Sequence, residues 1–305
     1  MTYAIISDIH GNFPALEATL AHARANGADE YILIGDYTCR IPWDNEVVNA
    51  IRNLSPAHVI RGNGEGHYLN MQKIKTSIAH EQFKPLSWSY NKITPENLSY
   101  LLALPEAMTI LHEGIDIHLA HSIDFLFNPG VIDFFHTIQF NNRMRASPIT
   151  HQEYLVLGKE AVLSYALDNV LALPKGIYLS GHNHLQFFME HEGRVFINPG
   201  SCGMPADWDP RTSYTLLAVN GKLWEVEERR VTYDTEATAA GLITTGFHHY
   251  APIWSEAIQM QILTGKEYFG WLVTHIDKTK KRLGQAAPPS EVWNKAVKTW
   301  DIKVL

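Results

Sequence analysis

Short apolar runs alternate with segments of helical periodicity over the first part of the chain. The runs Tyr3–Ile6, Tyr31–Ile34 and His58–Ile60 have the apolar and β-branched character of short buried strands. The segments between them, Phe13–Asn26 and Asn45–Asn53, place apolar residues three and four positions apart, which predicts helices. This β-α-β-α-β order indicates parallel strands joined by right-handed crossovers.

Strands continue in the second half of the chain and give way to helices near its end. The further strands that we expect are Ile115–Leu119, Gly176–Leu179, Arg194–Asn198, Thr212–Val219 and Lys222–Glu228, the last two joined by a hairpin turn at Asn220-Gly221. From about Thr235 the chain is rich in alanine and helical in pattern, and a last helix is expected over Glu291–Trp300. We therefore expect a core domain over residues 1–234 and a helical extension over residues 235–305 that packs on it.

One irregular stretch interrupts the strands. Residues Ile123 to about Ile149 are rich in Phe, Asn and Pro, so an inserted loop or cap is expected at about 123–150. Its aromatic part, Phe125–Phe140, fits either a lid over a nucleoside base or packing against the helical extension. We favour the lid because the stretch follows directly on His121.

Length, composition and charge restrict the class of protein. The 305 residues are 46% hydrophobic and 19% charged, which is typical of a globular protein with a sizeable core. A formal charge of −7 lacks the basic excess of a general nucleic-acid binder. It is compatible with a small phosphorylated or nucleotide substrate, since bound metal ions supply local positive charge.

The sequence also carries no sign of a membrane or a secretory location. No stretch approaches the length of a membrane span, and the first residues lack the basic region of a signal peptide. The two cysteines, Cys39 and Cys202, lie far apart and suggest no disulfide framework. We expect a cytoplasmic protein with no membrane partner. The sequence does not indicate an oligomeric state.

Potential metal ligands follow five of the predicted strands directly. They are Asp8 and His10 after the first strand, Asp36 after the second, Asn63 after the third, His121 after the fourth, and His182 and His184 after the fifth. Each alone would be an ordinary polar loop residue. Because open α/β sheets build their sites at the carboxyl ends of the strands, their joint occurrence predicts one metal site.

The number and type of these donors indicate two ions rather than one. Two carboxylates, one amide oxygen and four imidazoles are too many for a single ion that also leaves room for substrate. They suit two ions that share a bridging carboxylate, an arrangement that clamps an in-line displacement at phosphorus. A mixed nitrogen and oxygen set without thiolate favours Mn, Fe, Zn or Ni over Ca or Mg.

The ligand segments resemble a known family in their order and in their neighbouring residues. Asp8-x-His10, Gly35-Asp36, Gly62-Asn63, Ala120-His121-Ser122 and Gly181-His-Asn-His184 resemble the five blocks of the calcineurin-like metallophosphoesterase superfamily. The segments GDYTCRIPWDNEVV, INPGSCGMPADWDPRTSY and RRVTYDTEATAAGL are similar to a bacterial subgroup of small phosphodiesterases and diadenosine-tetraphosphatase-like enzymes. The resemblance covers about residues 1–270.

This resemblance implies a four-layer αββα sandwich, here with a helical C-terminal extension, and a metal-dependent phosphoric ester hydrolase. It assigns Asp8, His10, Asp36 and His184 to one ion, and Asp36, Asn63, His121 and His182 to the other. Asp36 is then the bridge, and a hydroxide held between the ions attacks phosphorus. The implied substrate is a phosphodiester or a phosphoanhydride, with a dinucleoside polyphosphate favoured.

The chain departs from the family beside the metal asparagine. Many members have a histidine there that assists the leaving group, and this chain has Gly64. His67 is a candidate to protonate the leaving oxygen instead. The alternative for His67 is a surface or structural histidine at the start of a helix. Glu65 also has two possible roles, since it could orient a metal ligand or be a solvated acidic residue.

A second departure concerns recognition of the phosphate. Relatives often have arginine where this chain has Ala206. Phosphate contacts would then fall to other arginines, and the candidates are Arg40, Arg143, Arg145 and Arg211. Each of these also fits a surface or salt-bridging role.

Two other functions compete with this interpretation. A broad-specificity phosphodiesterase, or a phosphatase acting on monoesters or phosphoproteins, would use the same ligands. A metal-bearing scaffold without turnover would fit the missing histidine and the helical extension. The presence of all seven ligands argues against the scaffold.

Overall fold

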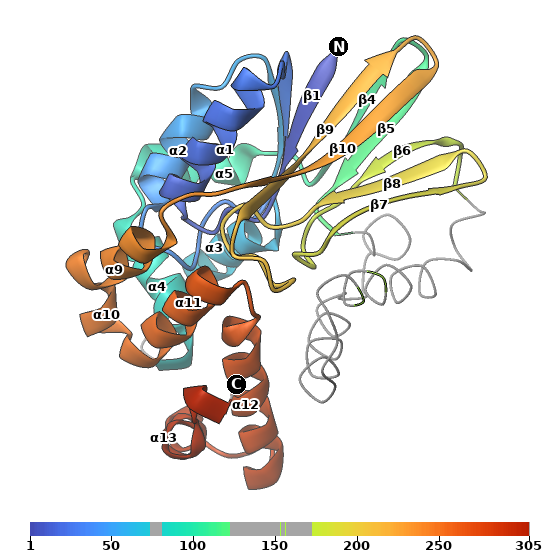
Figure 1. Ribbon diagram of the computed structural model, residues 1–305. Coiled ribbons are helices and arrows are strands. Elements are labelled where there is room, and N and C mark those ends of the chain that lie inside the picture. The colour runs from blue at the N-terminus through green and yellow to red at the C-terminus, as the bar shows by residue number, and fades with distance from the viewer. Residues whose placement is uncertain (74–80, 123–152, 154–155, 157–172, 305) are drawn as a thin grey trace.

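The computed structural model describes residues 1–73, 81–122, 153, 156 and 173–304, and Figure 1 traces the chain through them. The expected insert at 123–150, with Arg143 and Arg145, lies outside the described residues. The predictions made for that stretch therefore remain predictions.

The first sheet contains the predicted β-α-β-α-β unit. Its strands are β1 (Thr2–Ile6), β2 (Glu30–Ile34), β3 (Ala57–Ile60), β9 (Thr212–Asn220) and β10 (Leu223–Val231). Their order is β10-β9-β1-β2-β3, with β1, β2 and β3 parallel. The turn between β9 and β10 is Gly221-Lys222, one residue later than predicted, because Asn220 still pairs with Leu223 and glycine takes the first, positive-φ turn position.

The second sheet contains two strands that the sequence pattern did not predict. Its strands are β4 (Ala107–His112), β5 (Ile115–Ala120), β6 (Gly176–Leu179), β7 (Gln186–His191) and β8 (Arg194–Pro199), in the order β4-β5-β6-β8-β7. The unpredicted strands β4 and β7 pair antiparallel with β5 and β8. Their two-residue turns are Glu113-Gly114 and Glu192-Gly193, with positive φ at both positions. Such turns favour Asn-Gly or Asp-Gly, so Glu-Gly gave a weaker hairpin signal.

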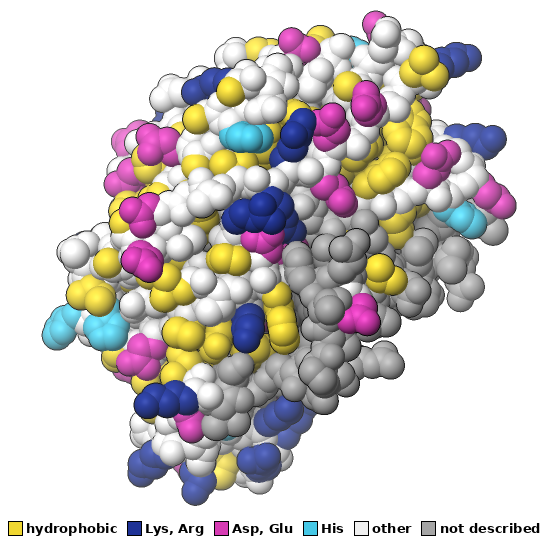
Figure 2. Space-filling view, in the orientation of Figure 1, with side chains coloured by type: hydrophobic (Ala, Val, Ile, Leu, Met, Phe, Trp, Pro, Cys, Tyr) yellow, Lys and Arg dark blue, Asp and Glu magenta, His cyan; other side chains and the backbone are white. Residues whose placement is uncertain are grey.

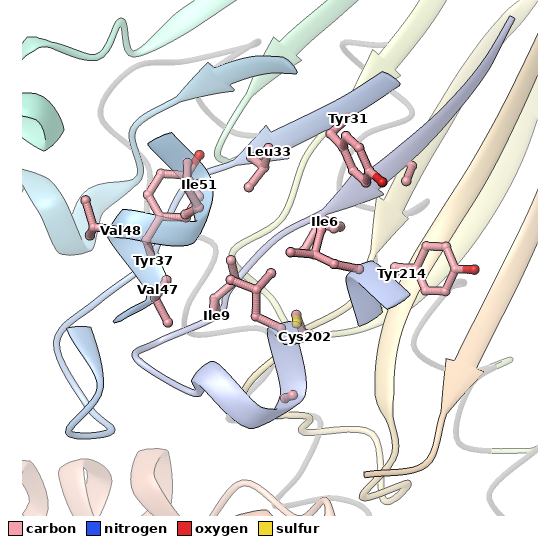
Figure 3. Packing of buried hydrophobic residues seen from close by; sticks show 14 of the residues in the cluster. Ile6, Ile9, Tyr31, Leu33, Tyr37, Val47, Val48, Ile51, Cys202 and Tyr214 are labelled. Carbon is pink, nitrogen blue, oxygen red and sulfur yellow. The ribbon is translucent and has the colours of Figure 1, made fainter. Parts of the chain in front are cut away.

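Helices cover the outer face of the first sheet, as Figure 1 shows for α1 (Phe13–Ala25), α2 (Asp44–Arg52) and α5 (Pro95–Ala103). The side chain of Asn12 caps α1 by accepting the Ala15 N–H at 3.2 Å. Figure 3 shows the core between these helices and the sheet, to which Ile6 and Leu33 contribute from the strands and Val48 and Ile51 from α2. Two more helices and a 3₁₀ turn follow β3, namely α3 (Asn63–Lys73), η2 (Glu81–Phe83) and α4 (Lys84–Lys92).

A second apolar core lies between the two sheets. Every second residue of the strands contributes to it, among them Ile5, Ile32, Leu119 and Ile197. The parallel strands β5 and β6 need a crossover connection, and the segment between them lies largely outside the described residues, so the fourth layer of the expected sandwich stays a prediction. The two mixed sheets with flanking helices and C-terminal helices confirm the predicted α/β fold.

The chain after β10 folds into helices with an apolar core of their own. They are α9 (Thr235–Thr244), α10 (Phe247–Tyr250), α11 (Pro252–Thr264), α12 (Tyr268–Leu283) and α13 (Pro289–Thr299), followed by a 3₁₀ turn, η3 (Ile302–Val304). Trp254, Ile258, Trp271 and Trp293 are buried in this core. In Figure 1, α9–α11 lie at about the height of α3 and α4, and α12 and α13 lie below them. Across the described residues, none of the helices has the length and apolar character to span a membrane.

Candidate metal centre

The predicted ligands meet where the carboxyl ends of the strands of both sheets come together. Six of them form two groups, one of Asp8, His10 and His184 and one of Asp36, His121 and His182, and within each group the ligand atoms lie within 4.8 Å of one another. Asn63, at the start of α3, lines the same cavity as His10 and Asp36. The structure thus brings all seven predicted ligands to one site.

The Asp36 carboxylate lies between the two groups. Its Oδ1 is 3.4 Å from Nε2 of His121, and its Oδ2 is 3.9 Å from Nε2 of His10. On the side of His10, the Nε2 atoms of His10 and His184 are 3.1 Å apart. This is the position that a carboxylate shared between two ions requires.

Backbone carbonyls orient three of the imidazoles. The Nδ1 atoms of His10, His121 and His184 lie 3.3, 2.6 and 2.7 Å from the carbonyl oxygens of Thr38, Ile34 and Met204, respectively. A carbonyl only accepts, so each Nδ1 carries a proton and each Nε2 is the nitrogen left to face a metal ion. Histidines that bind metal ions are commonly oriented in this way.

The site contains buried polar atoms that the protein itself does not satisfy. Within the described part of the chain, Oδ1 of Asp8 and Nε2 of His121 have no hydrogen-bond partner. Buried polar atoms are normally paired, so these two need an explanation. Each belongs to one of the two ligand groups, and a cation bound at its group would satisfy it. The residues therefore fit a metal ion.

The charges of the site also suit a cation. Burial would raise the pKa of Asp8 and of Asp36, but the neighbouring histidines outweigh it and hold both pKa values below the usual range. Burial, together with the charge of Arg40, lowers the pKa of His10 well below its usual value. Burial and His121 lower the pKa of His182 to about 4. The two carboxylates are thus ionised, and His10 and His182 are neutral, which are the forms that bind metal. His121 differs: burial would lower its pKa, but Asp36 and Asp8 outweigh burial and raise the pKa to about 10, so a cation would bind to its Nε2 in exchange for a proton.

The backbone at the ligands is strained. Five of the seven predicted ligands have φ between 51° and 71°, namely Asp8, His10, Asp36, His182 and His184. Such values are uncommon outside glycine and most costly for larger side chains. Tertiary hydrogen bonds hold them, since the N–H of Asp8 donates to Gly35 O at 3.1 Å and that of His10 to Asp36 O at 2.9 Å.

Close packing explains the glycines in the ligand segments. A Cβ atom at Gly62 would lie 2.2 Å from Oδ1 of Asp36, and one at Gly35 would lie 2.4 Å from the Gly62 nitrogen. Neither position has room for a side chain. The glycines let the loops after β2 and β3 approach closely enough to place Asp36 beside Asn63.

Glu65 holds these two loops together. It is fully buried, and its oxygens accept N–H groups of Asp36 at 3.0 Å, Tyr37 at 2.8 Å and Gly62 at 2.9 Å. Full burial excludes the solvated alternative for Glu65. Its role is to orient the backbone that carries the Asp36 ligand.

A cavity of about 640 Å³ opens beside the ligands. Some of the other predicted site residues line it and others do not. Arg40, His67 and Gly64 line it. Arg211 is not among its lining residues, because its guanidinium binds the carboxylate of Asp209, with Nε 3.0 Å from Oδ1.

The structure shows further residues that hold the ligand segments in place and that the sequence analysis did not identify. The Ser201 hydroxyl donates to the Asp8 carbonyl at 2.7 Å, and Gln261 on α11 donates to the Met204 carbonyl at 3.3 Å. That carbonyl also accepts the proton of His184, so the C-terminal helices support a ligand directly. The Asn-Pro-Gly-Ser201 segment after β8 is a strand exit that could have pointed to Ser201. Nothing local marks Gln261.

We expect that Mn²⁺ added to the metal-free protein raises its melting temperature by about 5 °C or more. An ion stabilises the folded state because only that state brings the ligands together. Differential scanning fluorimetry with Mn²⁺, Zn²⁺ and Ca²⁺ at equal concentrations measures the shift, and the nitrogen-containing site predicts the smallest shift for Ca²⁺. His112→Ala, which removes a histidine bonded to Tyr3, is the control and should keep the shift. Equal shifts with all three ions would contradict a specific site.

Comparisons with known proteins agree with this geometry. The family model for the calcineurin-like phosphoesterase superfamily domain matches residues 1–222. An uncharacterized protein of Methanocaldococcus jannaschii is 27% identical over 246 residues, which cover 76% of this chain and 87% of that protein.

Two solved structures are similar in fold. A metallophosphoesterase from Sphaerobacter thermophilus has a TM-score of 0.61 and 23% identity, over 87% of this chain and 99% of that one. A hypothetical protein from Pyrococcus horikoshii OT3 has a TM-score of 0.59 and 20% identity, over 83% of this chain and 97% of that one. The family match spans more than half of the chain and includes every predicted ligand. The chain therefore belongs to the calcineurin-like phosphoesterase superfamily and is a metal-dependent phosphoester hydrolase.

Proposed function

We propose that the site binds two divalent transition-metal ions, Mn, Fe, Zn or Ni. One ion would be held by Asp8, His10, Asp36 and His184, and the other by Asp36, Asn63, His121 and His182. The observation that carries this proposal is the Asp36 carboxylate, whose two oxygens face His10 and His121 from different ligand groups. When bound, the ions would activate water and neutralise the charge that develops on the phosphoryl oxygens.

Arg40 is the arginine that we propose for binding the phosphoryl group. It lines the cavity together with His10 and Asp36, and no carboxylate of the described residues forms an ion pair with it. A guanidinium matches phosphate oxygens in geometry and charge. Arg211 is less suitable because Asp209 already binds it. The prediction for Arg143 stays open.

His67 is the proposed acid for the leaving group. Its side chain is exposed and lines the cavity, one helical turn from Asn63. An imidazole at such a place can donate a proton to a departing oxygen. Because Gly64 contributes no side chain, the space between Asp36 and His67 is open to the leaving group.

We propose a phosphodiester or a phosphoanhydride as the substrate, with a dinucleoside polyphosphate favoured. The cavity supports this choice because it extends from the ligands to residues of α12 and α13, well beyond the size of a phosphate group. A substrate with a large group on each side of the reacting phosphorus would use that space. A small monoester would leave most of it empty.

The experiment that tests this function is a comparison of substrates on the manganese-loaded protein. We expect diadenosine tetraphosphate and bis(p-nitrophenyl) phosphate to give a higher kcat/KM than p-nitrophenyl phosphate. A preference for the monoester would instead support a phosphatase of monoesters or phosphoproteins. Hydrolysis of the nitrophenyl diester with no preference for the nucleotide would support a broad-specificity phosphodiesterase. No hydrolysis of any ester at saturating metal would support the non-catalytic scaffold.

A further inference from the structure

The cavity at the metal ligands continues between two walls that lie outside the ligand loops. One wall comes from η2 and α4, with Phe83 and Leu86. The other comes from α12, where Phe269 and Val273 face the cavity. Trp254 of α11 also lines it, and its Nε1 donates to the Glu81 carbonyl at 2.9 Å, which ties the two walls together.

These walls are apolar and only partly covered. Phe83 is 42% exposed, and Phe269, Val273 and Leu86 are half-buried. On α12 the cavity-lining residues recur at helical spacing, so one face of this helix borders the cavity as well as the core of the C-terminal helices. Partly exposed apolar residues around a concave site are typical of a ligand pocket.

Arg40 stands at the junction between the ligands and the apolar walls. Its guanidinium carbon lies 4.4 Å from the centre of the Phe269 ring, and the same side chain lines the cavity beside His10 and Asp36. Stacking on Phe269 and the contact of Nη1 with Met204 Sδ at 3.9 Å orient the guanidinium, and its other nitrogens can bind an anion. A phosphate at the ligands would thus have its organic substituent pointing along the Phe269 wall.

The cavity also has polar groups beyond the apolar walls. Gln82, Asp277, Lys280 and Gln285 line it and offer both hydrogen-bond donors and acceptors. The last turn of α12 is basic, with Lys280, Lys281 and Arg282. In Figure 2, Lys and Arg side chains gather at the lower end of the molecule, where Figure 1 places α12 and α13. Positive charge at this end attracts an anionic substrate.

We propose that this cavity is a nucleoside subsite, built by the C-terminal helices, for one organic group of the substrate. The flat base would stack on the exposed ring of Phe83 and touch the edge of Phe269, since Arg40 lies over the face of the Phe269 ring. The polar edge of this base, or the ribose, would reach the amide and charged groups. An alkyl chain would leave those polar groups without partners, so the walls favour a nucleoside over a lipid. The inference rests on the proposed function, because it takes the reacting phosphate to lie at the metal ligands.

Binding of product-like monoesters to the manganese-loaded protein tests the subsite. Isothermal titration calorimetry measures the affinities of adenosine 5′-monophosphate, octyl phosphate and methyl phosphate. These three monoesters share the phosphate and differ only in the organic group attached to it. We expect the nucleotide to bind at least about tenfold more tightly than methyl phosphate, since stacking one base on an aromatic side chain suffices for this ratio. Equal affinities would overturn the subsite, and a preference for octyl phosphate would replace the nucleoside by an alkyl chain.

Two variants from opposite walls locate the effect. Phe83→Ala and Phe269→Ala should each lower the ratio of nucleotide to methyl phosphate affinity toward one. Because Phe83 is exposed, Phe83→Ala should perturb the fold little. It therefore keeps the test valid if Phe269→Ala displaces Arg40 or destabilises the protein. Leu283→Ala is the matched control, because Leu283 lies on α12, is 37% exposed and does not line the cavity. An unchanged ratio in both wall variants would overturn the proposal.

Hydrolysis separates this inference from the proposed function. Thymidine 5′-(p-nitrophenyl phosphate) and methyl p-nitrophenyl phosphate share the leaving group and differ only in the other ester group. We expect the thymidine ester to have the higher kcat/KM by at least about tenfold. Equal values for the two esters would overturn the subsite while leaving the phosphodiesterase standing. If neither ester is hydrolysed, the proposed function fails, and the binding ratios still decide whether the subsite exists.

Discussion

We expect Asp36→Asn to lower kcat/KM for a phosphodiester by about three orders of magnitude or more. This corresponds to a loss of about 4 kcal/mol in transition-state stabilisation. Asp36 is the carboxylate whose Oδ1 and Oδ2 face His121 and His10 at 3.4 and 3.9 Å. Asparagine keeps the shape but removes the negative charge, and its NH₂ group cannot bind a cation. The substitution would weaken both proposed ions, whereas each of the other ligands is assigned to one ion only.

Steady-state hydrolysis of bis(p-nitrophenyl) phosphate at saturating Mn²⁺ measures this effect. Asp29→Asn is the matched control, since Asp29 is an exposed residue just before β2 that accepts the Thr2 N–H at 2.8 Å, away from the site. It should retain wild-type turnover. Circular dichroism would verify that both variants are folded. Turnover of Asp36→Asn within a few-fold of wild type would refute the shared role of Asp36.

Glu65→Gln is expected to have the second largest effect, on metal affinity and on stability together. The two oxygens of Glu65 accept three backbone N–H groups, from Asp36, Tyr37 and Gly62. Glutamine has one acceptor oxygen, so its NH₂ group must face at least one buried N–H. An unsatisfied buried donor costs about 1–3 kcal/mol of unfolding free energy. The loop carrying Asp36 would loosen, and the dissociation constant for Mn²⁺ would rise by about 10- to 100-fold.

Urea unfolding and a manganese binding isotherm measure the two parts of this prediction. Glu46→Gln on the exposed face of α2 makes the same chemical change without a buried partner and should leave both quantities near wild type. If Glu65→Gln lost stability but bound Mn²⁺ normally, Glu65 would support the fold and not the ligand loop. If both quantities stayed at wild-type values, the three hydrogen bonds would have no energetic role.

The C-terminal helices contact residues of the site, which their sequence pattern does not indicate. They were predicted as an extension, and the structure places them against the site in two ways. Gln261 supports the carbonyl that orients His184, and Phe269 packs under Arg40. A change in these helices can therefore act on the metal ligands and on the cavity without altering any residue of the ligand loops.

The sequence alone determined the parallel unit β1-α1-β2-α2-β3 and predicted the seven ligand candidates that the structure brings to one site. This was possible because strand and helix periodicities are local, and because the ligands directly follow strands whose carboxyl ends must share one edge of a sheet. It did not reveal β4 and β7, since their Glu-Gly turns lack the usual hairpin residues and take positive φ only in the folded chain.

Only the tertiary structure decided how the remaining residues are used. Arg40 and Arg211 look alike in sequence, but Arg40 lines the cavity while Arg211 is bound to Asp209. Glu65 could have been solvated, yet it is buried beneath three backbone N–H groups. The grouping of the ligands around Asp36 and the cavity wall on α12 depend on contacts between segments far apart in the chain. Such contacts cannot be predicted from periodicity in the sequence, because they arise from packing between elements and not from the conformation of any single element.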